Sequence, residues 1–181
     1  MAVRLLDPAA GGDAGLVEQL TDLINGVYAT AEHGLWRDGA TRTTPSELAG
    51  LIEAREIAVA TVGGRLVGAV RVQAISDATG EFGMLVADPE YRGIGVGRAL
   101  IAFAERHSRD RGLRAMQLEL LVPRTWRHPS KVFLDDWYRR IGYRVIRTTS
   151  LDDMYAELSP LLATPCELVV YEKPLEGMKP G

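Results

Sequence analysis

The stretch that decides the fold reads EYRGIGVGRAL and spans residues 90–100. Three glycines alternate there with two branched apolar residues, an arginine precedes them, and apolar residues recur at helical spacing over 96–107. The first N–H groups of a helix lack partners and carry a partial positive charge, which suits an anion. Glycine also lets an anion come close to the backbone, since no Cβ intervenes. The stretch therefore predicts a phosphate or pyrophosphate site at the start of a helix.

The glycine pattern fits neither of two common nucleotide-binding loops. The dinucleotide fingerprint G-x-G-x-x-G needs a third glycine where Arg98 stands, and the Walker pattern needs a Gly-Lys-Ser/Thr sequence that the stretch lacks. Both failures disfavour a nucleotide-binding domain. A glycine-rich turn without a ligand is the alternative for a lone glycine triplet, but Arg92 and the helix that follows favour an anion site.

The segments around this stretch predict the architecture. Gly63-Gly64 between two apolar runs indicates a β-hairpin, because a type I′ turn needs positive φ at both central residues. Periodicity predicts strands over 3–6, 57–62, 65–74, 80–87, 115–122, 143–148 and 166–174, helices over 16–27, 44–52, 95–109 and 132–140, and a helical turn near 152–158. This order predicts an α+β (mixed α/β) fold, with about four helices around a mostly antiparallel twisted sheet of about seven strands and a parallel pair in its middle.

Composition limits the other possibilities. The chain of 181 residues is expected to form one domain, residues 1–181. A net charge of -3 without a basic run disfavours nucleic acid as a partner, and no apolar run approaches the ~20 residues of a membrane span. Cys166 is the one cysteine, the opening residues lack a signal-peptide core, and the three histidines lack metal-ligand spacing. We expect a cytoplasmic protein without a metal, and the preference for arginine over lysine suggests a bacterial origin.

Two segments carry a resemblance to a known family. EFGMLVADPEYRGIGVGRALI (81–101) resembles the acyl-CoA-binding motif of the GNAT N-acetyltransferase superfamily, Gln/Arg-x-x-Gly-x-Gly/Ala, with Arg92, Gly95 and Gly97 at its fixed positions. WYRRIGYRVIRT (137–148) resembles the Tyr-x-x-x-Gly-Phe/Tyr segment of the same family. One predicted helix and one predicted strand separate the two segments, as the family requires. The resemblance extends over nearly the whole chain, but its specific motifs lie within about 80–147.

The resemblance implies an acetyl-CoA-dependent N-acetyltransferase, in which a primary amine attacks the thioester directly in a ternary complex. The end of the 81–87 strand would splay from its parallel neighbour, and an amide near Val86 would stabilise the oxyanion. The coenzyme would lie against Leu85, Val86, Ala87, Arg92, Gly93, Ile94, Gly95, Val96, Gly97 and Arg98. The family often has an asparagine before the tyrosine of its second motif, and the aligned position here is Lys131, so Lys131 or the neighbouring Ser130 is expected to take that coenzyme contact.

Two residues are candidates for proton transfer. Glu81 precedes the coenzyme loop and is the candidate general base, because an amine of pKa near 10 is mostly protonated at neutral pH. The alternative for Glu81 is a solvated carboxylate at a strand edge. Tyr138 matches the family tyrosine and is the candidate acid for the departing thiolate, and its alternative is a packing role.

The acceptor is the least defined part of the prediction. The resemblance places the acceptor near the segment between the first two helices, and this segment and the later loop 123–131 hold Glu32, His33, Trp36, Arg37, Arg42 and Trp126. An aromatic residue with several arginines could bind an amine that also carries a carboxylate, although loop arginines are usually only solvated and Trp36 can be a core residue. The sequence leaves open a small-molecule or protein amine. A homodimer and a non-catalytic acyl-CoA sensor on the same fold also stay open.

Overall fold

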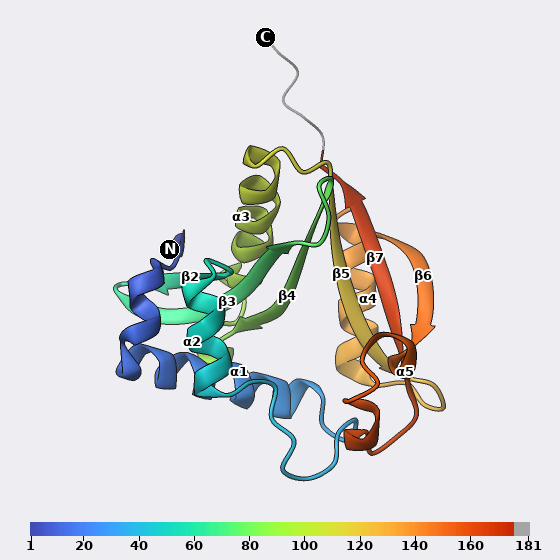
Figure 1. Cartoon of the computed structure of the whole chain (residues 1–181). Coiled ribbons are helices and arrows are strands. Elements are labelled where there is room, and N and C mark those ends of the chain that lie inside the picture. The colour runs from blue at the N-terminus through green and yellow to red at the C-terminus, as the bar shows by residue number, and fades with distance from the viewer. Residues whose placement is uncertain (176–181) are drawn as a thin grey trace.

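The computed structural model describes residues 1–175, so the last six residues of the predicted domain 1–181 lie outside the described part. Seven strands form one sheet in the order β1-β2-β3-β4-β5-β7-β6 (Figure 1). The strands are β1 Ala2–Leu5, β2 Ile57–Val62, β3 Arg65–Ala74, β4 Thr79–Ala87, β5 Ala115–Pro123, β6 Arg144–Ser150 and β7 Cys166–Pro174. Every neighbouring pair is antiparallel except β4 and β5, which are parallel. The predicted mixed sheet with one parallel pair is confirmed.

The α-helices are α1 Ala14–Ala31, α2 Pro45–Glu53, α3 Val96–Asp110, α4 Pro129–Arg140 and the short α5 Leu151–Met154. The 3-10 turns are η1 Pro8–Gly12, η2 Pro89–Tyr91 and η3 Ser159–Leu161. Side-chain caps define two of the starts, because Asp13 accepts from Leu16 N and Thr44 accepts from Glu47 N. In the described part of the chain, no helix combines the length and apolar character of a membrane span.

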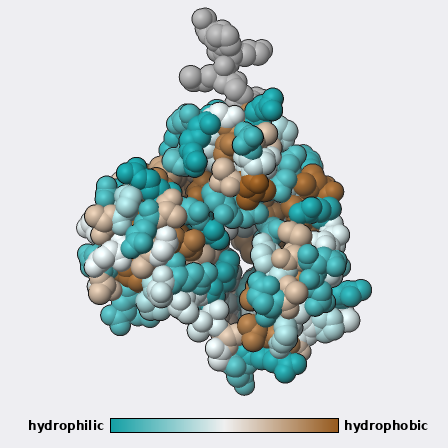
Figure 2. All heavy atoms as spheres, in the orientation of Figure 1, coloured by the Kyte–Doolittle hydropathy of each residue, from teal (hydrophilic) through white to brown (hydrophobic). Residues whose placement is uncertain are grey.

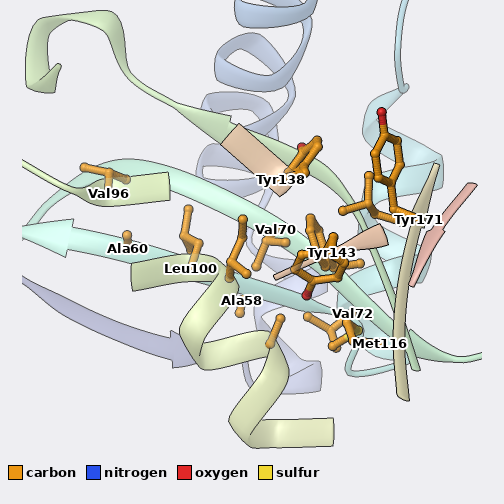
Figure 3. Close-up of a cluster of buried hydrophobic side chains, with 14 of the residues drawn as sticks. Ala58, Ala60, Val70, Val72, Val96, Leu100, Met116, Tyr138, Tyr143 and Tyr171 are labelled. Atoms are coloured by element: carbon orange, nitrogen blue, oxygen red, sulfur yellow. The ribbon is translucent and has the colours of Figure 1, made fainter. Parts of the chain in front are cut away.

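The helices cover the two faces of the sheet separately. One core cluster joins α3 and α4 residues such as Leu100 and Tyr138 to one face, and Figure 3 shows Tyr138, Tyr143 and Tyr171 gathered within it. A second cluster joins α1 and α2 residues such as Leu20 and Ile52 to the other face. We call these the α3/α4 face and the α1/α2 face. A third, smaller cluster around Leu35 and Leu168 closes the sheet below β5 and β7.

The strands β4 and β5 stay paired for only three residues. The paired residues are Thr79 with Ala115, Gly80 with Met116 and Glu81 with Gln117. Beyond Glu81 the two strands are no longer paired. Beyond this point each strand stays paired with its other neighbour, since β4 pairs with β3 up to Ala87 and β5 pairs with β7 up to Pro123. The sheet therefore opens between β4 and β5, and Figure 2 shows a hollow between the two halves of the molecule.

A β-bulge accompanies this opening. The register between β3 and β4 shifts between Ala69 and Arg71, and Met84 on β4 has φ 47°. A bulge bends its strand and increases the local twist, which turns the end of β4 away from β5. The bulge also changes which side chains face which layer, because Phe82 packs in the α3/α4 cluster whereas Met84 and Val86 pack in the α1/α2 cluster.

Candidate active site

The glycine loop ends on the α3/α4 side of the opening, at the start of α3. Gly93 and Gly95 have φ of 88° and 87°, and Gly95 caps the helix without any side-chain hydrogen bond. Residues with a Cβ rarely adopt this conformation, so glycine is needed at both positions. Within residues 1–175, none of the N–H groups of residues 93–98 donates to a protein acceptor. The start of α3 therefore offers unpaired amides and a partial positive charge.

The arginines of the loop are available for an anion as well. Arg92 and Arg98 are exposed, and neither takes part in an ion pair in the described part of the chain. Ile94 is also exposed, whereas Val96 points into the core beneath the helix. Packing favours glycine at position 97, since a Cβ on Gly97 would lie 3.1 Å from the ring of Trp137 on α4. The loop thus combines exposed arginines with the place where α4 packs against α3.

Beyond Glu81, the edge of β4 that faces β5 is unpaired, so it has backbone N–H groups without a strand partner, as expected from the separation of the two strands. Asp88 N donates to Val67 O of β3 at 2.9 Å. Because amides alternate in direction along a strand, Val86 N–H also points to β3, and the N–H groups of Leu85 and Ala87 point toward the cleft. This alternation favours Leu85 and Ala87 over Val86 as the amides that meet a bound acyl group.

Glu81 lies on the α1/α2 face at the point where β4 and β5 separate. Gln73 on β3 donates from Nε2 to Glu81 Oε1 at 2.9 Å, and Arg71 in turn donates to Gln73 Oε1 at 2.9 Å. Arg71 is held by Glu56 at 2.7 Å. Because Arg71 occupies the amide oxygen of Gln73, the NH₂ group of Gln73 is directed toward Glu81. Burial raises the pKa of the Glu81 carboxyl, and the charge of nearby Glu119 raises it further, against the lowering effect of the Gln73 hydrogen bond.

Tyr138 reaches the cleft from the opposite face. The side chain is only 5% exposed and packs against Phe82, Tyr143 and Tyr171 with ring centroids 5.9–6.2 Å apart (Figure 3). Its hydroxyl forms no hydrogen bond within residues 1–175. Burial raises the pKa of Tyr138, and the second cause is Tyr28 on α1, which belongs to the other layer. Glu81 and Tyr138 therefore approach one opening from the two faces of the sheet.

The predicted acceptor residues lie on a strap, residues 32–43, that runs from the end of α1 across to the β5–β7 half of the molecule (Figure 1). Glu32 is 9% exposed and forms an ion pair with Lys131 at 2.5 Å, and it accepts from Trp36 Nε1 at 2.5 Å. Arg37 donates to the carbonyl of Leu162 at 3.1 Å. Trp36 bridges to the same Leu162 by its backbone. These residues anchor the strap.

Lys131, the residue expected to contact the coenzyme arm, forms an ion pair with the strap. Lys131 is 5% exposed and its ammonium is paired with Glu32, so the strap already occupies the group expected to meet the coenzyme arm. Ser130, the other residue expected there, uses its amide to donate to His128 Nδ1 in the cap of α4. The coenzyme contact of Lys131 stays a prediction, and its ion pair with the strap is what the structure shows.

Of the other predicted acceptor residues, only Arg42 stands close to the titratable groups of the cleft. Its guanidinium lies 5.2 Å from the centre of the Tyr28 ring, and Asn25 on α1 holds the adjacent backbone by accepting from Arg42 N. His33 is exposed, and its carbonyl contacts His128 Nε2 at 3.1 Å. Trp126 is 40% exposed and packs against the His128 ring.

Three residues of the cleft were absent from the sequence-based prediction: Tyr28, Glu119 and Tyr155. Tyr155 donates from its hydroxyl to Glu119 Oε2 at 2.8 Å. Burial raises the pKa of Tyr155, the Glu119 hydrogen bond and the charges of Glu119 and Glu81 raise it further, and the charge of Arg42 lowers it. The alternation of residues 115–122 could have indicated Glu119, because a polar residue that alternates with Leu118 and Leu120 faces away from their core. No local pattern indicates Tyr155, which follows a four-residue helix.

A family model for the acetyltransferase (GNAT) domain matches residues 53–145, just over half of the chain. No curated protein matches the sequence. Among solved structures, an aminoglycoside 6'-N-acetyltransferase complexed with coenzyme A has a TM-score of 0.71 and 15% identity, over 100% of both chains. The protein yncA of Salmonella typhimurium, solved with its cofactor acetyl-CoA, has a TM-score of 0.66 and 16% identity, over 100% of this chain and 97% of that one.

A ribosomal-protein-alanine N-acetyltransferase from Brucella melitensis shows the same fold, with a TM-score of 0.65 and 16% identity over 96% of this chain and 99% of the other. At these identities the likeness establishes the fold alone. The family model independently covers the β-hairpin, the splayed strand, the glycine loop and the helix that carries Tyr138. The chain therefore belongs to the GNAT acetyltransferase family.

Proposed function

We propose that the protein is an N-acetyltransferase that transfers the acetyl group of acetyl-CoA to a primary amine by direct attack. The observation that carries this proposal is the opening between β4 and β5, which connects the glycine loop on one face with Glu81 on the other. Amides and arginines at the start of α3 would bind the coenzyme pyrophosphate. The pantetheine arm would then lie between the splayed strands, with its thioester near the free amides of Leu85 and Ala87.

In this arrangement the acceptor enters from the α1/α2 face. Glu81 removes a proton from the ammonium form, directly or through water, and the neutral nitrogen attacks the thioester carbonyl carbon. The N–C bond forms, negative charge develops on the carbonyl oxygen, and a backbone amide of β4 stabilises that charge. Collapse breaks the C–S bond and releases the thiolate of CoA, which accepts a hydrogen bond from the Tyr138 hydroxyl. The nitrogen, positively charged after its attack, gives up its second proton to water or to the thiolate.

Burial defines what Glu81 and Tyr138 can each do. A carboxyl with a raised pKa is a stronger base than an exposed one, so Glu81 suits proton removal from an amine. The raised pKa of Tyr138 keeps its phenol protonated, so it serves better as a hydrogen-bond donor to the sulfur than as a full proton donor. Holding the two substrates in one cleft supplies a further part of the rate.

The test is calorimetric titration with acetyl-CoA, followed by an amine screen that detects the free thiol of CoA. We expect micromolar binding by the wild type and roughly tenfold weaker binding by Arg92→Ala, which loses one charge-assisted contact. Arg106→Ala is a matched control, since Arg106 is an exposed arginine farther along the same helix. No binding by the wild type would overturn the proposal. Binding without transfer to any amine would instead favour a coenzyme sensor.

A further inference from the structure

Four half-buried polar side chains form a continuous row that leads from the start of β2 across β3 to β4. Glu56 Oε2 accepts from Arg71 Nε at 2.7 Å, and Arg71 Nη2 donates to Gln73 Oε1 at 2.9 Å. Gln73 lies directly opposite Glu81 in the pairing of β3 with β4, and its Nε2 donates to Glu81 Oε1 at 2.9 Å. We call these four residues the polar row. The polar row ends on the last residue of β4 that is paired with β5.

Arg71 gives the polar row a direction. A guanidinium has hydrogen-bond donors only, so Arg71 can bond to the Gln73 amide only through the amide oxygen. If the amide were turned over, its NH₂ group would face the guanidinium and this bond would be lost. The ion pair with Glu56 holds the guanidinium in place from the other side. The NH₂ group of Gln73 therefore has to face Glu81.

A donor that is fixed in this way favours one protonation state of Glu81. An N–H group bonds more strongly to a carboxylate than to a neutral carboxyl. An amide that could turn freely would instead offer its oxygen to the protonated form of Glu81 and stabilise that form. Arg71 prevents this turn, so the polar row favours the carboxylate. The row thereby opposes burial and the charge of Glu119, both of which raise the pKa of Glu81.

The charged neighbours of Glu81 do not replace this contact. Among residues 1–175, Glu81 takes part in no ion pair, and Gln73 is the one side chain that donates to it. The charge of Arg71 also lowers the pKa of Glu81, but its effect is smaller than that of the Gln73 hydrogen bond. The groups whose charge acts on Glu81 or on its neighbour Tyr155 are Arg71 on β3, Glu119 on β5, Tyr155 itself and Arg42 on the strap.

We propose that Gln73 is a positioning residue for the reaction and that Arg71 acts through it to keep Glu81 ready as a carboxylate. Gln73 occupies Oε1 of Glu81, whereas Oε2 has no hydrogen-bond partner in the described part of the chain. Oε2 is therefore the atom that receives the proton when the ammonium nitrogen of the acceptor releases it. The inference rests on the proposed function, in which Glu81 is the base, and adds how the fold keeps that base deprotonated.

The test is an NMR titration of the side-chain carboxyl carbons in the full-length protein labelled with ¹³C-glutamate. The Glu81 signal is assigned by its absence in Glu81→Gln. Gln73→Met keeps the length of the side chain and removes its polar atoms, so the titration midpoint of Glu81 should rise by about one pH unit. Arg71→Met should raise it in the same direction by a smaller amount. Arg71→Lys keeps a cation that can only donate, so it should restore most of the wild-type midpoint.

A double-mutant cycle separates an effect through the Gln73 amide from a simple effect of charge. If Arg71 acts through the amide, Arg71→Met should have about a third or less of its effect once Gln73 is already methionine. An undiminished effect would mean that Arg71 acts by its charge alone, which would overturn its proposed role. An unchanged Glu81 midpoint in Gln73→Met would overturn the whole inference.

Glu172→Met is the matched control. Gln117 lies opposite Glu81 in the pairing of β4 with β5, yet it donates to Glu172 on β7 at 2.8 Å. The control therefore removes an equivalent bond between a glutamine and a glutamate on neighbouring strands. Denaturant unfolding should show similar losses of stability for Glu172→Met and Gln73→Met, but only Gln73→Met should move the Glu81 midpoint. Equal shifts in the two variants would show that any broken cross-strand bond suffices, and the inference would fail.

The pH–rate profile separates the inference from the function on which it rests. Thiol release with the amine found in the acceptor screen should show an acid limb that moves with the NMR midpoint, and kcat of Gln73→Met at high pH should stay within about threefold of the wild type. If the acid limb disappears in Glu81→Gln but the NMR midpoint does not move in Gln73→Met, only the inference fails. If the midpoint moves and the acid limb does not, Glu81 is not the base, and the proposed role of Glu81 fails together with the inference.

Discussion

On the α3/α4 face the cleft between β4 and β5 meets the glycine loop, whereas on the α1/α2 face it meets Glu81, Glu119 and the strap. The loop side presents backbone amides of six successive residues, 93–98, that have no protein acceptor in the described part of the chain, and its geometry follows from two glycines with positive φ. The acceptor side uses side chains from α1, β4, β5 and the segment after α5. One side is local in sequence, and the other exists only after the sheet has assembled.

This difference has a consequence for how each side responds to mutation. A local site built on backbone can be damaged only by changing the conformation of that segment. A site assembled from distant segments depends on the contacts that hold the segments together, here the ion pair between Glu32 and Lys131. Substitutions that break this ion pair should therefore affect stability and activity together, whereas substitutions in the loop should affect coenzyme binding through the local backbone conformation.

The largest effect is expected at the strap. Lys131→Met leaves the buried Glu32 carboxylate without its cation, which should lower the free energy of unfolding by about 3–5 kcal/mol. Denaturant unfolding measures this loss. The pair Glu32→Leu and Lys131→Met together should recover most of it, since no buried charge remains. A loss below about 1 kcal/mol for the single variant would show that the pair is effectively solvated and that the strap is held by other contacts.

The same variants sharpen the role of Lys131 in coenzyme binding. Glu32→Gln and Lys131→Met both break the ion pair, so a strap effect should weaken acetyl-CoA binding equally in the two. Calorimetric titration of both variants compares them. A larger loss in Lys131→Met alone would indicate that Lys131 also contacts the coenzyme, as the family resemblance implied.

Glu81→Gln should lower kcat about 100-fold, which is typical for loss of a general base. In the wild type the rate should fall as pH drops through the raised pKa of Glu81, because the protonated carboxyl cannot accept a proton. This acid limb should be absent in Glu81→Gln. Since the folded protein holds this proton more tightly than the unfolded chain, stability should also decrease as pH rises through that pKa, and the variant should lose this decrease. An unchanged pH–rate profile would remove Glu81 from the mechanism.

Gly95→Val should weaken acetyl-CoA binding roughly 30-fold, the loss of about one charge-assisted hydrogen bond. Valine is strained at φ 87°, so the loop must change conformation and move its amides. Gly112→Val is the matched control, because Gly112 follows the other end of the same helix with φ 84° and has no atom near its missing Cβ. Both variants should lose similar stability, and only Gly95→Val should lose coenzyme affinity. Equal losses of affinity would mean that helix stability, rather than the loop, controls binding.

The contrast between the two sides also explains which features the sequence could predict. The glycine loop, the hairpin at Gly63-Gly64 and the order of strands follow from local patterns, and the structure confirms the sheet that they predict. The bulge at Met84 could not be predicted, because it depends on pairing with β3 and its positive φ falls on a methionine rather than on the neighbouring Gly83. Lys131 was expected near the coenzyme by alignment alone, whereas its partner Glu32 lies 99 residues away. Tyr155 and Glu119 meet across 36 residues, a contact that is likewise set only by the fold.

Tyr138 lies in the core cluster of the α3/α4 face, and its substitution should have the smallest effect. Tyr138→Phe removes one hydrogen bond to the departing sulfur, so kcat should fall about tenfold, equivalent to about 1.4 kcal/mol. The effect stays small because a thiolate leaves readily without help and the raised pKa of the phenol prevents full proton transfer. For the same reason Tyr138 should produce no alkaline limb in the pH–rate profile over the range in which a free tyrosine ionises. Tyr143→Phe is the control, since the Tyr143 hydroxyl donates to Glu105 within the core, and its loss should lower stability without changing kcat. A 100-fold or larger fall in Tyr138→Phe would mean that proton donation to sulfur limits the reaction, and the cleft would then be organised around its acid rather than its base.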